Sequence, residues 1–362
     1  MYAARENRRP FPTSPRVLRG ARLIGFWMQW VQFELVRRLR QRRLAGAARL
    51  RYIGPMLFTV PSNQIERLAP DQLSDELERG QVVYFATCPL RLPDDADLTF
   101  LRSDIAQYLL RKNVSYYPDA NRLTGLKADP TVIARALAIL KTYSERVQSF
   151  LRGVVPAFMR GARLGTSSFR PLQERGRNLK PHASNELVHV DAGAYGATHG
   201  DRILRFFTNV NPTEDRVWMS KGCFIDLYRR HAKLAGIDAE ARGGVEEKWV
   251  DRAYSGFVRA ASKVLPLASV IDSSPYDRTM RKFHNYMKDT PRFQRDTEGQ
   301  VQMIFKPYSS WMVLTDAVSH ACISGQHAFV DTFLVPLANC RLRQLAPYEI
   351  LKASAPFAAA ER

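Results

Sequence analysis

A histidine and an aspartate two residues apart, His189 and Asp191, place the tightest constraint on what this chain can fold into. They end the apolar run 186–191, and in a β-strand residues two apart point to the same face. One imidazole and one carboxylate are two thirds of the 2-His-1-carboxylate triad, which binds Fe(II) and leaves coordination positions open. The sequence therefore predicts a strand that ends at a metal site, with the third ligand supplied by another part of the chain.

The surrounding pattern mixes strands and helices. The residue periodicity predicts helices at Leu73–Arg79 and Pro130–Leu151 and a helical region at 224–289. Strands are expected at residues 81–85, 113–118, 166–172, 186–191, 202–210, 303–305, 311–314, 320–323 and 329–334. A run of strands, a helical interruption and further strands favours an α+β fold, with a jelly-roll core buttressed by helices and a helical insertion between core strands.

We expect the chain to have three parts: an N-terminal extension (1–60), a core domain (61–340) and a C-terminal tail (341–362). The extension stands out by its charge. Residues 1–52 carry thirteen arginines, no lysine and two glutamates, so they hold +11 of the formal net charge of +19. Trp27 and Trp30 lie between these arginines, as in helices that bind the membrane interface. Peripheral membrane binding is therefore expected; a basic helix docked on the core and a disordered arm are the alternatives.

Composition also bears on location and partners. No stretch reaches the roughly 18 apolar residues of a spanning helix, and neither a signal peptide nor a paired-cysteine motif is evident. We therefore expect a cytoplasmic protein. The strongly positive charge favours an anionic partner.

The third ligand must come from the remaining histidines. His320 begins a short strand after a tight turn, which is where a distal imidazole is expected, and His327 is the competitor. The others lie in loops or in expected helices, where surface or packing roles are the simpler interpretation: His182, His199, His231 and His284.

Several segments resemble the Kdo hydroxylases, which are Fe(II)- and 2-oxoglutarate-dependent dioxygenases that hydroxylate 3-deoxy-D-manno-oct-2-ulosonic acid (Kdo) at C3 in the inner core of lipopolysaccharide. The resemblance covers roughly residues 70–335, and the segments that carry it are 77–85, 112–116, 168–171, 189–191, 200–212 and 274–278. It implies a double-stranded β-helix in which His189, Asp191 and His320 bind the iron. It also implies 2-oxoglutarate and O₂ as co-substrates, succinate and CO₂ as products, and stimulation by ascorbate.

The far carboxylate of 2-oxoglutarate needs a cation. Many members of the wider superfamily place an arginine about ten residues beyond the distal histidine, but here that position is Val330. By strand parity Arg205 and Asn209 share a face, so we expect Arg205 with Asn209 to be the anchor and Arg170 to be the second choice. The alternative is that Arg205 pairs with a surface acid.

The substrate implied by the resemblance is also anionic. Arg278, Arg281 and Lys282 are expected to line its approach, although a solvated basic helix face is an equally simple interpretation. The leading hypothesis is a Kdo 3-hydroxylase that acts on a Kdo-containing lipid A precursor at the anionic inner-membrane surface of a Gram-negative bacterium. The alternatives are a dioxygenase acting on another anionic sugar or nucleotide, and a non-enzymatic basic protein that binds nucleic acid or membrane. No nucleic-acid-binding motif is evident, so no nucleic-acid partner is expected.

Overall fold

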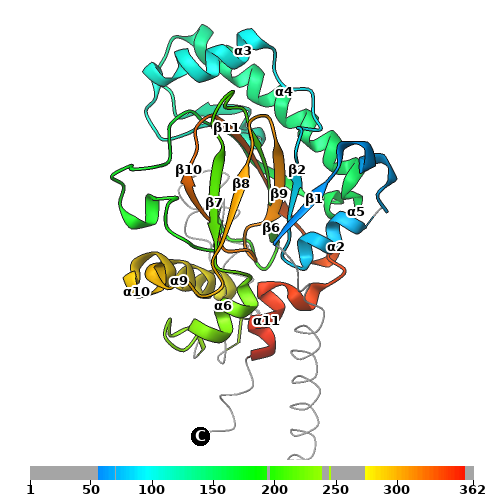
Figure 1. The fold of residues 1–362 in the computed structure, drawn as a ribbon, viewed down its shortest axis with the longest axis vertical. Coiled ribbons are helices and arrows are strands. Elements are labelled where there is room, and N and C mark those ends of the chain that lie inside the picture. The colour runs from blue at the N-terminus through cyan, green and yellow to red at the C-terminus, as the bar shows by residue number, and fades with distance from the viewer. Residues whose placement is uncertain (1–55, 70, 194–195, 239–243, 246–273, 355–362) are drawn as a thin grey trace, which may run out of the picture. The chain divides into compact units, whose positions relative to one another are not determined.

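Two β-sheets face each other in the computed structural model (Figure 1), which describes residues 56–69, 71–193, 196–238, 244–245 and 274–354. The chain divides into two compact units, Met1–Arg49 and Leu50–Arg362, and all of the described residues belong to the second. The predictions for the basic extension before residue 56 lie outside the described residues. No helix of the described part is long and apolar enough to cross a bilayer.

The larger sheet has eight strands, and its only parallel pair is β1 with β2. In spatial order the strands are β1 (Leu57–Val60), β2 (Val82–Phe85), β9 (Ser310–Leu314), β6 (Arg202–Asn209), β11 (Ala328–Val335), β5 (Arg163–Arg170), β3 (Val114–Tyr117) and β4 (Arg122–Thr124). The smaller, antiparallel sheet contains β10 (Ala321–Ser324), β7 (Arg216–Ser220) and β8 (Val301–Phe305). The predicted α+β class is confirmed, and the facing sheets agree with a jelly-roll core.

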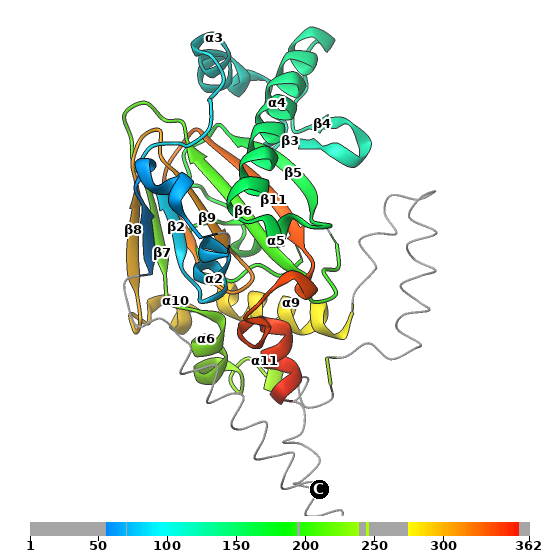
Figure 2. The ribbon, with the colours of Figure 1, turned by 90° about the vertical axis from the view of Figure 1, so that its right-hand side faces the viewer.

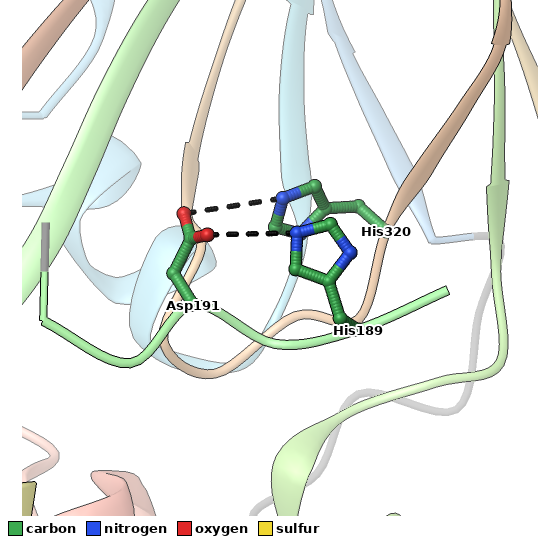
Figure 3. Close-up of side chains that lie close together, drawn as sticks. All are labelled: His189, Asp191 and His320. Atoms are coloured by element: carbon green, nitrogen blue, oxygen red, sulfur yellow. Dashed lines mark ion pairs between the residues drawn. The ribbon is translucent and has the colours of Figure 1, made fainter. Parts of the chain in front are cut away.

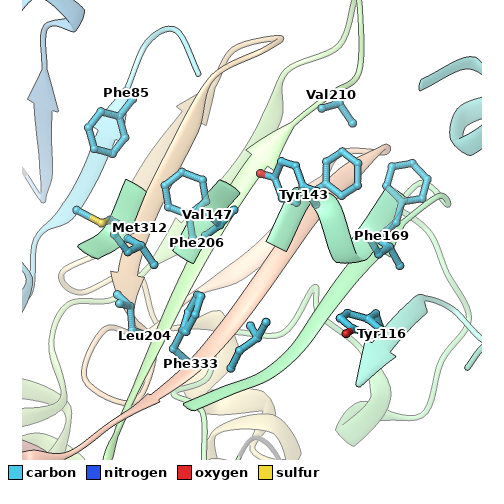
Figure 4. Close-up of a cluster of buried hydrophobic side chains, with 14 of the residues drawn as sticks. Phe85, Tyr116, Tyr143, Val147, Phe169, Leu204, Phe206, Val210, Met312 and Phe333 are labelled. Atoms are coloured by element: carbon cyan, nitrogen blue, oxygen red, sulfur yellow. The ribbon is translucent and has the colours of Figure 1, made fainter. Parts of the chain in front are cut away.

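Strand alternation gives the larger sheet two different faces. On β11, Phe329 and Phe333 belong to the hydrophobic cluster beneath helix α4 (Pro130–Val154), while Val330 belongs to the cluster between the sheets. Figure 4 shows the first cluster, in which Tyr143 and Val147 of α4 meet the sheet. Helix α4 covers one face of the larger sheet. The polar residues at alternate strand positions therefore face the space between the two sheets.

The remaining helices lie on the same face of the larger sheet as α4 or toward the ends of the two sheets (Figures 1 and 2). They are α2 (Gln72–Glu78), α3 (Asp95–Thr99), α5 (Pro156–Met159), α6 (Phe224–His231), α9 (Pro275–Asp289), α10 (Pro291–Arg295) and α11 (Pro347–Ser354). Short 3-10 or π turns connect them: η1 (Ser62–Arg67), η2 (Phe100–Asp104), η3 (Ile105–Tyr108), η4 (Pro118–Ala120), η5 (Pro181–Ala183), η7 (Leu337–Asn339) and η8 (Arg343–Leu345). In the described part of the predicted insertion, α6 and α9 lie between β7 and β8, as expected.

The structure shifts both domain boundaries. Strand β1 falls inside the range assigned to the extension, yet it pairs with β2 along its whole length. At the other end α11 falls inside the predicted tail, but Ile350 and Leu351 are buried against the core. Both segments contribute to the core, so the folded unit extends beyond residues 61–340 in each direction.

Two strand predictions need correction. Residues 186–191 form no strand; His189 makes only an isolated antiparallel bridge with His320. Strand β7 is absent from the expected strands, which leave residues 211–302 without one. Instead Asn211 accepts hydrogen bonds from the backbone of Thr213 and Glu214, which forms a tight turn that returns the chain directly into β7.

Candidate metal centre

Two histidines and one aspartate converge between the sheets (Figure 3). An isolated antiparallel β-bridge pairs the backbones of His189 and His320, with N···O distances of 3.1 and 2.8 Å. The backbone N–H of Asp191 donates to Thr315 O at 2.9 Å. The Nε2 atoms of the two imidazoles lie 3.7 and 3.9 Å from carboxylate oxygens of Asp191. One ligand atom from each residue lies within 4.8 Å of the other two, which is close enough to share a metal ion.

The hydrogen bonds of the two imidazoles suit metal binding. His189 Nδ1 lies 2.7 Å from Leu187 O, and His320 Nδ1 lies 3.0 Å from Val318 O, so each ring contacts the carbonyl two residues earlier. A carbonyl can only accept, so each Nδ1 carries the proton and each Nε2 directs its lone pair toward Asp191. Ligating histidines generally have such partners, which fix the ring and its tautomer.

Electrostatics set the protonation state of the donors. Burial lowers the pKa of His189 well below its usual range, and lowers that of His320 to about 4, so both rings are neutral near pH 7. Burial would raise the pKa of Asp191, but the Arg205 guanidinium, 2.8 Å away, brings it well below its usual range. Two neutral nitrogens and one carboxylate fit the donor set that binds Fe(II).

The structure brings together the expected triad and separates His327 from it. His327 has a left-handed backbone (φ 55°) and stacks on Phe169, with ring centroids 6.2 Å apart. By contrast, the His320 ring stacks on Trp218 of β7 at 5.2 Å. Sequence analysis missed Trp218 as a site residue because it missed the strand that carries it.

A cavity of about 320 Å³ opens beside the triad. Its lining contains the carboxylate of Asp191 and four cationic side chains, those of Lys112, Arg170, Arg205 and Lys288. Neutral polar groups and a few apolar side chains complete it, among them Asn113, Ser115, Tyr117, Thr166, Ser168, His182, Asn185, Phe207, Trp218, His284, Val330 and Thr332. The cavity is therefore suited to anionic ligands.

The predicted anchor residues divide into two groups. Arg205 and Arg170 line the cavity, but Asn209 does not. The Asn209 amide donates to Glu214 O and Phe305 O at 3.0 and 3.1 Å, because it lies at the end of β6 where the chain turns toward β7. The structure thus places the Asn209 amide outside the cavity lining, apart from Arg205 and Arg170.

A buried cluster of charges lies behind Arg170. Glu174, only 2% exposed, receives contacts from Arg170 at 3.3 Å, from Arg216 at 3.2 Å and from Arg177 at 3.5 Å. Burial would raise the pKa of Glu174, but the arginines lower it, so the carboxylate stays charged. The Nε of Arg170 is buried without a hydrogen-bond partner, so this arginine retains a donor for a ligand.

The inserted helix α9 contributes residues other than those expected. Arg278, Arg281 and Lys282 are exposed and do not line the cavity. His284 and Lys288, one helical turn apart, do line it, and His284 Nδ1 contacts Val190 O at 2.8 Å between the two predicted ligands. The inserted helix therefore reaches the cavity through His284 and Lys288, while Arg278, Arg281 and Lys282 lie on other sides of it.

Comparisons with known proteins agree with this geometry. Residues 62–356 match the family model described as 3-deoxy-D-manno-oct-2-ulosonic acid (Kdo) hydroxylase. Similar solved structures include the Kdo hydroxylase KdoO, a non-heme Fe(II) alphaketoglutarate-dependent dioxygenase, in its apo form and with alphaketoglutarate and Fe(III). Each is 23% identical, with a TM-score of 0.66 over 82% of this chain and 95% of the other, a likeness that shows the fold. No curated protein sequence matches the chain.

Proposed function

Because this chain belongs to the Kdo hydroxylase family, we propose that it hydroxylates Kdo at C3, in Kdo-lipid A, with Fe(II), O₂ and 2-oxoglutarate. The observation that carries the proposal is the triad of His189, Asp191 and His320, whose imidazole tautomers are fixed with both Nε2 atoms toward the carboxylate. It lies in a cavity with four cationic side chains, which matches an anionic co-substrate and an anionic sugar.

The side chains of the triad hold the iron through His189 Nε2, His320 Nε2 and the Asp191 carboxylate. Bound iron supplies the oxidising chemistry, in which 2-oxoglutarate is converted to succinate and CO₂ while one oxygen atom enters the sugar. Arg205 keeps Asp191 ionised, and Trp218 supports the His320 ring. Ascorbate is expected to stimulate turnover by keeping the iron reduced.

Arg170 and Arg205 are the proposed cations for 2-oxoglutarate. Arg205 is already 2.8 Å from the metal ligand Asp191, so it belongs next to the iron. Arg170 lies over the Phe207 ring at 6.0 Å. Both arginines have a buried Nε without a hydrogen-bond partner, so what separates them is that Arg205 already contacts Asp191. We therefore assign the far carboxylate of 2-oxoglutarate to Arg170, the second choice from the sequence, and leave Arg205 a supporting role near the metal.

We further propose that the protein acts on the cytoplasmic face of the inner membrane of a Gram-negative bacterium. Support comes from the sequence: residues 1–52 have a net charge of +11 and interleave tryptophans with arginines. Deleting residues 1–52 should weaken sedimentation with anionic liposomes while leaving neutral liposomes unaffected. Unchanged sedimentation would contradict this part of the proposal.

Mass spectrometry tests the activity. Kdo-lipid A incubated with the protein, Fe(II), ascorbate and 2-oxoglutarate should gain one oxygen, in proportion to the succinate formed. A His189→Ala variant is the matched control and should give neither product. Succinate formation that responds to another anionic sugar or to a nucleotide, with Kdo-lipid A unchanged, would favour the alternative substrate class.

A further inference from the structure

Two lysines converge on one short turn at the rim of the cavity. The Lys112 ammonium donates to Ala183 O at 2.9 Å, and the Lys288 ammonium donates to Ser184 O at 2.9 Å and to His182 O at 3.3 Å. Three consecutive carbonyls, from η5 and the residue after it, thus accept hydrogen bonds from two side chains that are 176 positions apart in the sequence. His182 is half exposed and also lines the cavity, so this turn is at the solvent end.

The charge of this lysine pair is only partly offset by nearby carboxylates. Among the described residues, neither ammonium forms an ion pair with a carboxylate, and the carbonyls of the turn are neutral acceptors. Lys288 is only 6% exposed. The nearby carboxylates of Asp191 and Asp289 favour its charged form, but Asp191 contacts Arg205 and Asp289 contacts His182, while Lys112 and Arg205 add positive charge. A buried cation with no carboxylate in direct contact is costly, so an anion that completes the pair would stabilise it.

The hydrogen-bonding capacity of the pair also fits an anion. An ammonium has three N–H donors, of which Lys112 uses one and Lys288 uses two. Three donors from two directions therefore remain, and a carboxylate with two oxygens can accept all of them.

We propose that Lys112 and Lys288 together bind the carboxylate of the substrate sugar acid, and that they order the turn η5 against it. The inference rests on the proposed function, because it takes the substrate to be a sugar acid. The co-substrate has its own cations, Arg170 and Arg205, which come from the strands of the large sheet. The lysines come instead from the segment before β3 and from the inserted helix α9.

Position along α9 supports the assignment to the sugar. Lys288 lies one helical turn after His284, which lines the cavity and contacts the backbone of Val190 between the metal ligands His189 and Asp191. One turn of helix is about 5.4 Å. The helix thus places the ammonium near the ligands but nearer the solvent end, where a sugar that remains attached to a larger molecule can reach it.

The test compares a Kdo glycoside with its neutral carboxylate methyl ester, each titrated anaerobically into protein that holds Fe(II) and 2-oxoglutarate. The wild type should prefer the acid by roughly 10- to 100-fold, as expected for charge-assisted hydrogen bonds. Lys288→Met and Lys112→Met should each reduce this preference at least several-fold, by weakening the binding of the acid while leaving the binding of the ester unchanged. Lys141→Met, at an exposed position on α4, is the matched control and should keep the full preference.

Each outcome decides the inference. It is overturned if the wild type does not prefer the acid, or if both lysine variants retain the full preference. It is also overturned if the variants lose affinity for the acid and for the ester equally, because the lysines would then only support the structure of η5. Retained 2-oxoglutarate binding shows that a variant is folded, and the two independent variants guard against failure of one. Failure of the proposed function is recognised separately by admitting O₂ to the same mixtures, because the wild type would then hydroxylate neither form of the sugar.

Discussion

The inner and outer ends of the cavity are built in different ways. At the inner end, His189 and His320 are oriented by carbonyls two residues earlier in the chain, and a backbone bridge joins them. At the outer end, Lys112 and Lys288 reach carbonyls of η5 from distant parts of the chain. The inner end is preorganised by short-range backbone geometry, whereas the outer end depends on long flexible side chains. Iron binding should therefore tolerate changes at the rim, while sugar binding should not.

Removing a triad member should have the largest effect. His320→Ala should weaken Fe(II) binding and slow 2-oxoglutarate turnover by roughly 100-fold or more. Loss of a metal ligand reduces metal affinity by more than loss of a residue that only orients a ligand. Equilibrium dialysis with Fe(II) and a succinate assay measure both. His327→Asn is the control: asparagine tolerates the left-handed backbone at this position, and iron binding should be unchanged. If His327→Asn lost iron and His320→Ala retained it, the ligand assignment would be reversed.

The ion pair behind the inner end should matter next. Asp316 contacts the fully buried Arg202 at 2.6 Å and follows Thr315, whose carbonyl binds the backbone of Asp191. Asp316→Asn should lower the free energy of unfolding by about 3 to 5 kcal/mol, because it leaves Arg202 buried without its counter-charge. Denaturant titration measures this.

An exposed ion pair provides the control for that experiment. Asp215 contacts Lys306 at the surface, and Asp215→Asn should leave the unfolding midpoint unchanged. Equal destabilisation by the two substitutions would show that burial of the Arg202 pair is not the source of the effect.

The two cavity arginines should differ from each other. Arg170→Ala should raise the 2-oxoglutarate requirement by roughly 10- to 100-fold with little change in iron binding, because it removes a charged partner of the far carboxylate. Arg205→Ala should raise the requirements for both iron and 2-oxoglutarate, since Arg205 also contacts Asp191. Initial rates over a matrix of iron and 2-oxoglutarate concentrations separate the two. A pure co-substrate effect for Arg205→Ala would return the anchor to Arg205.

The pH dependence of the outer end should be the smallest effect. Burial lowers the pKa of Lys288 from 10.5 to about 8, so its ammonium is lost as pH rises through about 8. Affinity for the sugar acid should then fall several-fold, while affinity for the methyl ester should not. Folding has the opposite sign: the unfolded chain holds this proton up to higher pH, so stability should increase between about pH 8 and 10.5. Lys288→Met should remove the fall in sugar-acid affinity and reduce the stability trend, to which Lys112 and Lys221 also contribute because burial lowers their pKa values. An unchanged fall in sugar-acid affinity in this variant would contradict the assignment to Lys288.

The same contrast explains what the sequence could predict. The His-x-Asp pair could be inferred because its two residues are close in sequence, and most of the strands around it because apolar residues recur in them with a regular period. The pair itself lies in a loop with a single β-bridge rather than in a strand. Helix α9 carries basic residues on several sides, so spacing alone could not show that Lys288 rather than Arg281 faces the cavity. Strand parity could not show that Asn209 lies outside the cavity lining, because it gives the face of a residue but not its depth along the cavity.

The resemblance to the Kdo hydroxylases includes two segments that contain residues of the cavity. Lys112 lies in one of its segments, 112–116, and Arg170 in another, 168–171. Both line the cavity, yet Lys112 was given no role because its partner carbonyl is 71 positions away. Long-range contacts of this kind appear only in the folded chain.

The central claim is that the inner end of the cavity binds iron and 2-oxoglutarate to oxidise a Kdo sugar. Turnover under heavy-isotope O₂ tests it most directly, with mass spectrometry of both products. We expect one labelled oxygen in each succinate, and one added oxygen on the sugar for each succinate formed, with both signals absent in His189→Ala. Unlabelled succinate, or labelled succinate at the wild-type rate from His189→Ala, would contradict it.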